Sequence, residues 1–115
     1  MFNFEKLEVW QKSVAFAGFV YRLTRIFPAD ERFGLTNQIR RAVTSVSANI
    51  AEGSARPPAD FAKFIGYATG SLHEVVTHAA LGRNEGFLGP EDYAQLYRDA
   101  EEISRMLSGL RKSLE

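Results

Sequence analysis

The stretch HEVVTH, residues 73–78, places two histidines and a glutamate close together, as helical zinc sites do. His73 and His78 are five positions apart rather than four, so their side chains diverge by about 140° around a helix. They cannot bind one metal ion from a single helix face, and we predict no metal site and no cofactor. Gly66 and Gly70 follow no predicted strand, so they do not form a phosphate-binding loop.

Residue types used in hydrolysis also occur nearby. Ser71 or Ser45 would supply a nucleophile, and His78 with Glu74 would supply its base and acid. Glu52 and Glu74 would form a carboxylate pair for acid–base catalysis. Because such residues are common on neighbouring helical turns, we predict no catalytic residues and no enzymatic activity. A hydrolytic or ligand-binding cleft at Glu52, Glu74 and His78 is kept as an alternative.

Polar residues form two lines, each beside an apolar stripe of a predicted helix. At about 100° per residue, each line stays on one side of its helix. The first line consists of Gln38, Arg41, Ser45, Asn49 and Glu52, and the second of Tyr67, Ser71, Glu74 and His78. Half-buried polar groups at a seam between helices need partners, because an unpaired one costs about 1–3 kcal/mol. We therefore predict contacts with another helix, another subunit or a ligand, with a solvated helix face as the alternative.

Proline and glycine divide the chain into segments that are expected to position these lines. Each segment has helical periodicity, and none alternates with the period of a strand. The predicted helices cover residues 6–27, 31–52, 59–85 and 90–114. Short links between them favour antiparallel neighbours, so the sequence predicts an all-α, antiparallel up-down four-helix bundle as a single domain over residues 1–115.

Composition limits the class of protein. The 115 residues are 45% hydrophobic and 24% charged, with no cysteine, and mean hydropathy is −0.19. Fourteen basic residues balance fourteen acidic ones, which argues against strong general binding to nucleic acid. The N-terminus lacks the pattern of a secretory signal and no run has the length of a membrane span, so we expect a cytoplasmic protein without a membrane partner.

The first predicted helix carries two apolar stripes, although a bundle core needs one face per helix. One stripe consists of Leu7, Trp10, Val14, Ala17 and Tyr21. The second consists of Val9, Phe16, Val20, Leu23 and Phe27. Because large apolar patches are uncommon on monomers, we predict that the second stripe is an interface for self-association. The alternative is a wide core contact with Phe2 and Phe4 folded over it.

Several small and charged residues lead to more local predictions. Gly53 is predicted as the left-handed residue that follows the second helix. Gly66 and Gly70 lie inside the third helix, where glycine costs about 1 kcal/mol relative to alanine, so we predict close approach of a neighbouring backbone. Arg40 is expected on the solvent side of the second helix.

Three stretches of the chain resemble a known family along nearly its whole length. They read FEKLEVWQKS, VYRLTRIFPADERFGLTNQIRRAVTSVSANIAEGSAR and DFAKFIGYATGSLHE. The chain resembles the small bacterial four-helix bundle family of ribosomal RNA intervening-sequence proteins. This resemblance implies a homo-oligomer, with a pentameric ring as the expected form, and no assigned enzymatic reaction. It also implies a shared surface made of Gln38, Arg41, Ser45, Asn49, Glu52, Arg56, Ser71 and Glu74.

The leading prediction is a non-enzymatic, homo-oligomeric interaction module whose protein partner is not identified by the sequence. The alternative is association with nucleic acid or a reverse transcriptase, as in the similar accessory proteins of diversity-generating retroelements. Those proteins are strongly basic, whereas this chain is neutral. The arginines that would serve this alternative are Arg22, Arg25, Arg32, Arg40 and Arg41.

Overall fold

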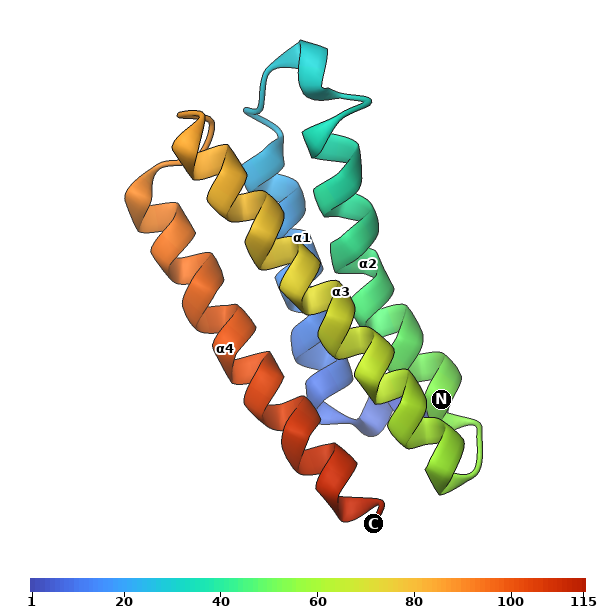
Figure 1. The fold of residues 1–115 in the computed structure, drawn as a ribbon. Helices are drawn as coiled ribbons and strands as arrows, with labels where there is room; N and C mark the ends of the chain where they lie inside the picture. The colour runs from blue at the N-terminus through green and yellow to red at the C-terminus, as the bar shows by residue number, and fades with distance from the viewer.

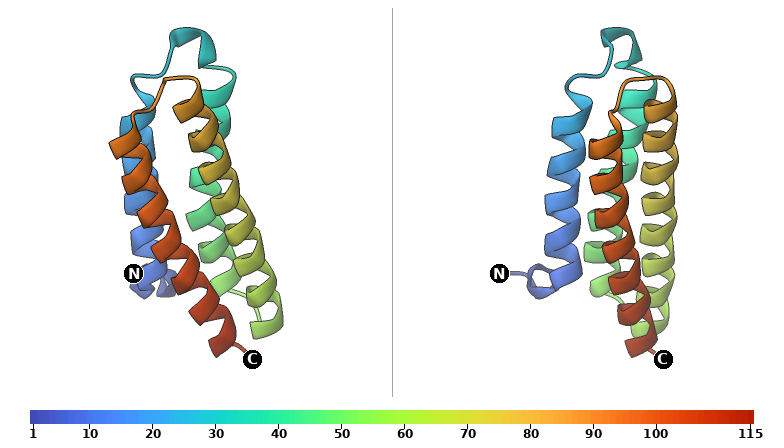
Figure 2. Two further views of the ribbon diagram at one scale, coloured as in Figure 1. Left: turned by 60° about the vertical axis from the view of Figure 1, so that its left-hand side comes forward. Right: turned by 90° about the vertical axis from the view of Figure 1, so that its left-hand side faces the viewer.

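Four long helices and two short 3₁₀ turns make up the computed structural model, which describes residues 1–115. The helices are α1 (Glu8–Thr24), α2 (Leu35–Ser54), α3 (Pro58–Asn84) and α4 (Pro90–Ser113), and the turns are η1 (Asn3–Lys6) and η2 (Ala29–Glu31). Successive helices run in opposite directions, and both termini lie at the end of the bundle that holds the α2–α3 link (Figures 1 and 2). The predicted four-helix bundle is confirmed.

The helices contact one another in chain order around the bundle. α1 packs on α2 and α4, α3 also packs on α2 and α4, and α2 and α3 form the closest pair. Twenty-one buried apolar residues form one core between them. Its centre includes Ile39, Val46, Leu72 and Leu107, which come from the predicted stripes of α2, α3 and α4. No helix combines the length and apolar character needed to span a membrane.

The helix boundaries follow local chemistry. Pro58 and Pro90 open α3 and α4, where proline fits because a first-turn N–H has no partner inside the helix. The second helix begins four residues later than predicted, at Leu35. The reason is that η2 forms separately and the Glu31 carboxylate accepts the Leu35 N–H at 3.0 Å. α1 ends at Thr24, three residues before the predicted end and ahead of Pro28, which disfavours a helical residue before it.

The assignment of the two stripes of α1 is wrong, because the predicted interface is the core face. Val9, Phe16, Val20 and Phe27 are buried within the single chain, and Leu23 is partly buried against the same core. Side chains that are already buried in this way cannot form a contact surface for a second copy. The first stripe therefore lies toward the outside of the bundle, where Leu7, Trp10 and Ala17 are partly buried at the edge of the core and Val14 and Tyr21 are exposed.

The outer face of α1, formed by Leu7, Trp10, Val14, Ala17 and Tyr21, is only partly covered. Phe4 of η1 packs edge-on against Trp10 with ring centroids 5.1 Å apart, and Phe2 stacks on Phe4. This covering agrees with one part of the alternative reading. The two phenylalanines cover only the N-terminal end of this face. Farther along the helix, Val14 stays 44% exposed and Tyr21 37% exposed.

Glycines act differently from the sequence prediction. Gly53 lies inside α2 without a left-handed conformation, and an added Cβ would lie 2.5 Å from Phe64 Cβ of α3. Its role is thus close packing between α2 and α3. Gly66 and Gly70 have no atom within 4 Å of an added Cβ, so the close approach predicted there does not occur within the chain. The only residue with a positive φ is Gly86, between α3 and α4.

Candidate functional site

The two polar lines face each other across a groove between α2 and α3. This α2–α3 groove has a volume of about 320 Å³ and is mostly polar. Its lining from α2 consists of Asn37, Gln38, Arg41, Ala42 and Ser45, and its lining from α3 consists of Ser71, Glu74 and His78. Five of the eight residues predicted as a shared surface are therefore brought together here.

Hydrogen bonds hold the floor of the groove in place. The Ser71 hydroxyl donates to Ser45 Oγ across the helix seam at 3.0 Å. The Asn49 side-chain amide donates to the carbonyl and to the Oγ of Ser45, at 2.8 and 3.0 Å. These half-buried groups satisfy one another within the chain, so their first role is to set the alignment of α2 against α3.

The charged groups of the groove have no such partners. Arg41 and Glu74 are both exposed, and neither makes an ion pair or a side-chain hydrogen bond within the chain. The side-chain amide of Gln38, which also lines the groove, makes no hydrogen bond within the chain. The groove therefore offers a guanidinium, a carboxylate and an amide whose hydrogen-bonding capacity is unused.

Glu52 and Arg56 lie outside this groove, at the far end of α2. They pair with each other at 3.4 Å, one helical turn apart, and both are exposed. The Arg56 guanidinium also lies over the Phe64 ring, 4.8 Å from its centroid. The shared surface predicted from the resemblance is thus divided into a groove and a separate ion pair.

This geometry does not assemble the hydrolytic site considered from the sequence. The Ser71 hydroxyl is directed to Ser45 rather than to His78 or Glu74, so no nucleophile–base pair forms. Glu52 is absent from the groove that holds the other two residues of the proposed cleft. No group of three histidine, aspartate or glutamate side chains is arranged to hold a metal ion.

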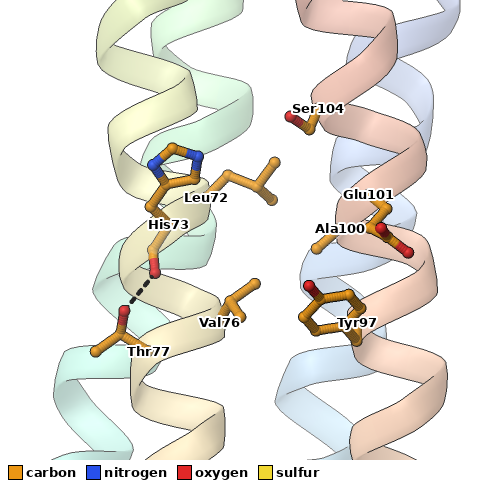
Figure 3. Close-up of a pocket in the computed structure, with 8 residues that line it drawn as sticks. All are labelled: Leu72, His73, Val76, Thr77, Tyr97, Ala100, Glu101 and Ser104. Atoms are coloured by element: carbon orange, nitrogen blue, oxygen red, sulfur yellow. Dashed lines mark hydrogen bonds between the residues drawn. The ribbon is translucent and has the colours of Figure 1, made fainter.

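A second groove, between α3 and α4, was not anticipated from the sequence. Leu72 and Val76 point toward α4 and Tyr97 points toward α3, around a space of about 370 Å³ (Figure 3). His73 lies at this groove, whereas His78 lies at the α2–α3 groove, so the two histidines diverge as their spacing predicts. The Thr77 hydroxyl donates to the His73 carbonyl at 2.8 Å, an ordinary helix contact.

The arginines considered for nucleic-acid binding do not form one surface. Arg22 lies at a groove between α1 and α4 whose lining includes the carboxylates of Asp99 and Glu102. Arg41 lies at the α2–α3 groove. The other three arginines surround a separate hollow beside the α1–α2 link; they are Arg25, Arg32 and Arg40. A continuous track for a polyanion is therefore not present on the single chain.

Comparison with protein families gives a match to the model of the 23S rRNA-intervening sequence protein over residues 5–109. The chain belongs to this family. The resemblance expected from the sequence is thereby confirmed, and the match covers α1, α2 and α3 and most of α4.

Among solved structures, the chain is similar to one described as a protein with unknown function from the S23 ribosomal protein family of Bacteroides thetaiotaomicron VPI-5482. The two chains are 27% identical, with a TM-score of 0.83, over 90% of this chain and 95% of the other. Curated protein sequences contain no match to it. The family and this relative support the fold, and neither carries a described activity.

Proposed function

We propose that this protein is a non-enzymatic helical-bundle module that assembles with copies of itself and presents the α2–α3 groove to a partner. The observation that carries the proposal is the outer face of α1. A row of apolar side chains runs along this face, and the chain covers it only in part. Leu7, Trp10 and Ala17 are partly buried against the core. Val14 and Tyr21 stay exposed, although the Arg40 guanidinium lies over one side of the Tyr21 ring. A second copy is the occupant that the proposal assigns to it.

The exposed fractions show why this face is suited to an interface. Phe2 is 71% exposed, Val14 44% and Tyr21 37%, and they lie on one side of the N-terminal region with half-buried Trp10. Burial of apolar surface is worth about 25 cal/mol per Å², and aromatic residues are enriched in interface cores. Association with a second copy would therefore bury apolar surface that stays in contact with water after a single chain has folded.

The glycines of α3 support the same proposal. Gly70 is exposed and Gly66 half-buried, and each faces open space within the chain. Glycine inside a helix costs about 1 kcal/mol relative to alanine, and nothing inside the bundle offsets that cost. The close approach of a helix from another copy would account for both positions.

The groove supplies the second half of the proposal, which is recognition of a partner. Arg41 and Glu74 present opposite charges without an internal ion pair, so a partner with the complementary arrangement would be oriented by them. The ordered serines beneath them hold α2 and α3 in place. A pentameric ring, which the family resemblance implies, and a cytoplasmic location are also part of this proposal.

Light scattering after size-exclusion chromatography tests the assembly. At micromolar concentration the measured mass of the wild-type protein should be two or more times the 12.9 kDa mass of one chain. The substitution Val14→Glu places a charge in the outer face of α1 and should shift the population toward monomer. Ser108→Glu is the matched control, because Ser108 is an exposed position on α4. A monomeric wild-type protein, or equal behaviour of both variants, contradicts the proposal.

Truncation of the groove arginine tests recognition. Arg41→Ala should weaken assembly or partner capture by more than about 0.5 kcal/mol, which is the usual limit for a surface substitution. Arg98→Ala on α4 is the control, since Arg98 is also exposed but lies outside the groove. Identical losses in the two variants would show that the groove has no particular role.

A further inference from the structure

A hollow of about 330 Å³ lies beside the link between α1 and α2, and three arginines line it. They are Arg25, Arg32 and Arg40, and no carboxylate is among the eight lining residues. The hollow is separate from the α2–α3 groove, and it adjoins the outer face of α1 at Tyr21, whose ring lies beneath the Arg40 guanidinium. We refer to it as the arginine hollow.

Arg40 is held in a fixed position within the arginine hollow. Its Nε donates to Thr24 Oγ1 at 2.9 Å and its Nη2 to the Tyr21 carbonyl at 3.3 Å. The guanidinium lies over the Tyr21 ring, 4.6 Å from the centroid. Arg40 is thus half-buried between α1 and α2 rather than on the solvent side as predicted, and it has no carboxylate partner. A partly buried cation without a counter-ion is ready to bind an anion.

The other charges near the hollow do not neutralise Arg40. Arg25 and Arg32 are exposed, and their guanidinium groups make no ion pair and no hydrogen bond within the chain. The Glu31 carboxylate is engaged with the Leu35 N–H at the start of α2, and it does not line the hollow. Three guanidinium groups therefore face one space without an internal anion.

Thr36 gives an independent indication of a missing ligand. Thr36 is only 8% exposed, and its hydroxyl oxygen is the single buried side-chain polar atom in the chain without a hydrogen-bond partner. Thr36 lines the arginine hollow and belongs to the first turn of α2, where free backbone N–H groups favour negative charge. An anion in the hollow would have a hydroxyl and the helix N-terminus on one side and guanidinium groups on the others.

We propose that the arginine hollow binds a phosphate group. Guanidinium groups recognise phosphate through paired N–H donors, and three of them match an anion with several equivalent oxygen atoms. The space is larger than one phosphate needs, so it also accepts the substituent of a phosphate ester. Phe33, 88% exposed, adjoins Arg32 with its ring centroid 6.0 Å from the guanidinium, and it offers a flat surface for an aromatic base.

Calorimetric titration with two probes tests the site and identifies the source of the phosphate. Inorganic pyrophosphate represents a free phosphate compound, and a short single-stranded oligonucleotide represents a phosphodiester chain. Saturable binding of either probe is expected, and it should weaken as salt increases. Binding of pyrophosphate alone indicates a small phosphate compound, whereas binding of the oligonucleotide alone indicates a nucleic-acid backbone. Absence of binding by both probes overturns the proposal.

A matched pair of double variants assigns the binding to the hollow. The double variant Arg25→Gln with Arg32→Gln should lower the affinity for the probe by about tenfold or more, as expected for the loss of hydrogen bonds to a charged group. Arg105→Gln with Arg111→Gln removes the same charge from exposed positions of α4 and should leave the affinity unchanged. None of the four guanidinium groups makes a hydrogen bond within the chain, so both proteins should fold. Equal losses in the two variants overturn the proposal.

Nuclear magnetic resonance of the wild-type protein gives a measurement that needs no variant. The amide signal of Thr36 should be among those that shift most during titration with the bound probe. The amides around Ser71, in the α2–α3 groove, should not shift. A shift pattern centred on the groove instead of the hollow would overturn the assignment.

Discussion

Replacement of Gly53 by alanine tests how α2 and α3 are held together. Gly53 is buried within α2, and an added Cβ would lie 2.5 Å from Phe64 Cβ and 3.0 Å from Phe61 Cδ1. Carbon atoms pack best at about 3.5–4.0 Å, so one of the two helices must shift by about 1 Å. Phe64 Cβ is attached directly to the α3 backbone, and rotation of the side chain cannot relieve the overlap.

The expected effect is the balance of two terms. Overpacking of this kind costs about 1–3 kcal/mol. Against this cost, alanine stabilises a helix interior by up to about 1 kcal/mol relative to glycine. The gain is smaller at Gly53, because α2 ends at the next residue. The free energy of unfolding should therefore fall by about 1–2 kcal/mol. At Gly109 of α4, where an added Cβ meets no atom and no contact with a second copy is proposed, the same substitution should raise it by about 0.5–1 kcal/mol.

Urea unfolding followed by circular dichroism measures both variants. The protein concentration must be the same throughout, because self-association adds to apparent stability. The two variants share the same chemical change, so opposite signs would isolate the contact with α3. If Gly53→Ala is as stable as the wild-type protein, Gly53 does not set the spacing of α2 and α3, and the reasoning is wrong.

Two further predictions concern a buried hydroxyl and a surface ion pair. Thr36→Val removes the unpartnered hydroxyl while keeping the shape of the side chain, so it should raise the free energy of unfolding by about 1 kcal/mol, and a loss of stability in urea would contradict this. The Lys12–Glu102 hydrogen bond and the attraction between the two charges lower the pKa of Glu102 and raise the pKa of Lys12. The stabilisation by the Glu102 carboxylate is therefore present at neutral pH, and it is lost as the pH falls through the lowered pKa of Glu102. The stabilisation by the Lys12 ammonium group is lost only as the pH rises through the raised pKa of Lys12. Glu102→Gln should be less stable than Glu101→Gln at neutral pH and low salt, and this difference should disappear in acid; a difference that persists would show another cause.

The helices and their polar lines could be predicted because they depend on local order along the chain. The prolines at 58 and 90 begin helices for steric reasons that operate in any context. The lining residues Arg41 and Ser45 fall on one side of α2 because of the helical repeat alone. The residues Ser71 and Glu74 are placed on α3 by the same rule.

Which residues the two polar lines contact could be found only from the packed structure. Helical geometry does not decide how α2 is rotated and shifted against α3, yet this decides that Ser45 meets Ser71 while Glu52 pairs with Arg56. The ion pair of Lys12 with Glu102 joins residues ninety positions apart, and no local pattern indicates it. Contacts of this kind depend on the shapes of several helices at once.

The amino-acid sequence by itself determined the number of helices, their approximate boundaries and the residue types on each face, because these follow from short-range sterics and periodic hydrophobicity. Only the tertiary structure decided which stripe of α1 is buried. The stripe that contains Val14 and the stripe that contains Phe16 are both apolar, so their hydrophobicity does not distinguish them. Packing against α2 and α4 selects the face whose side chains fill the shared core, and the other face is left outside.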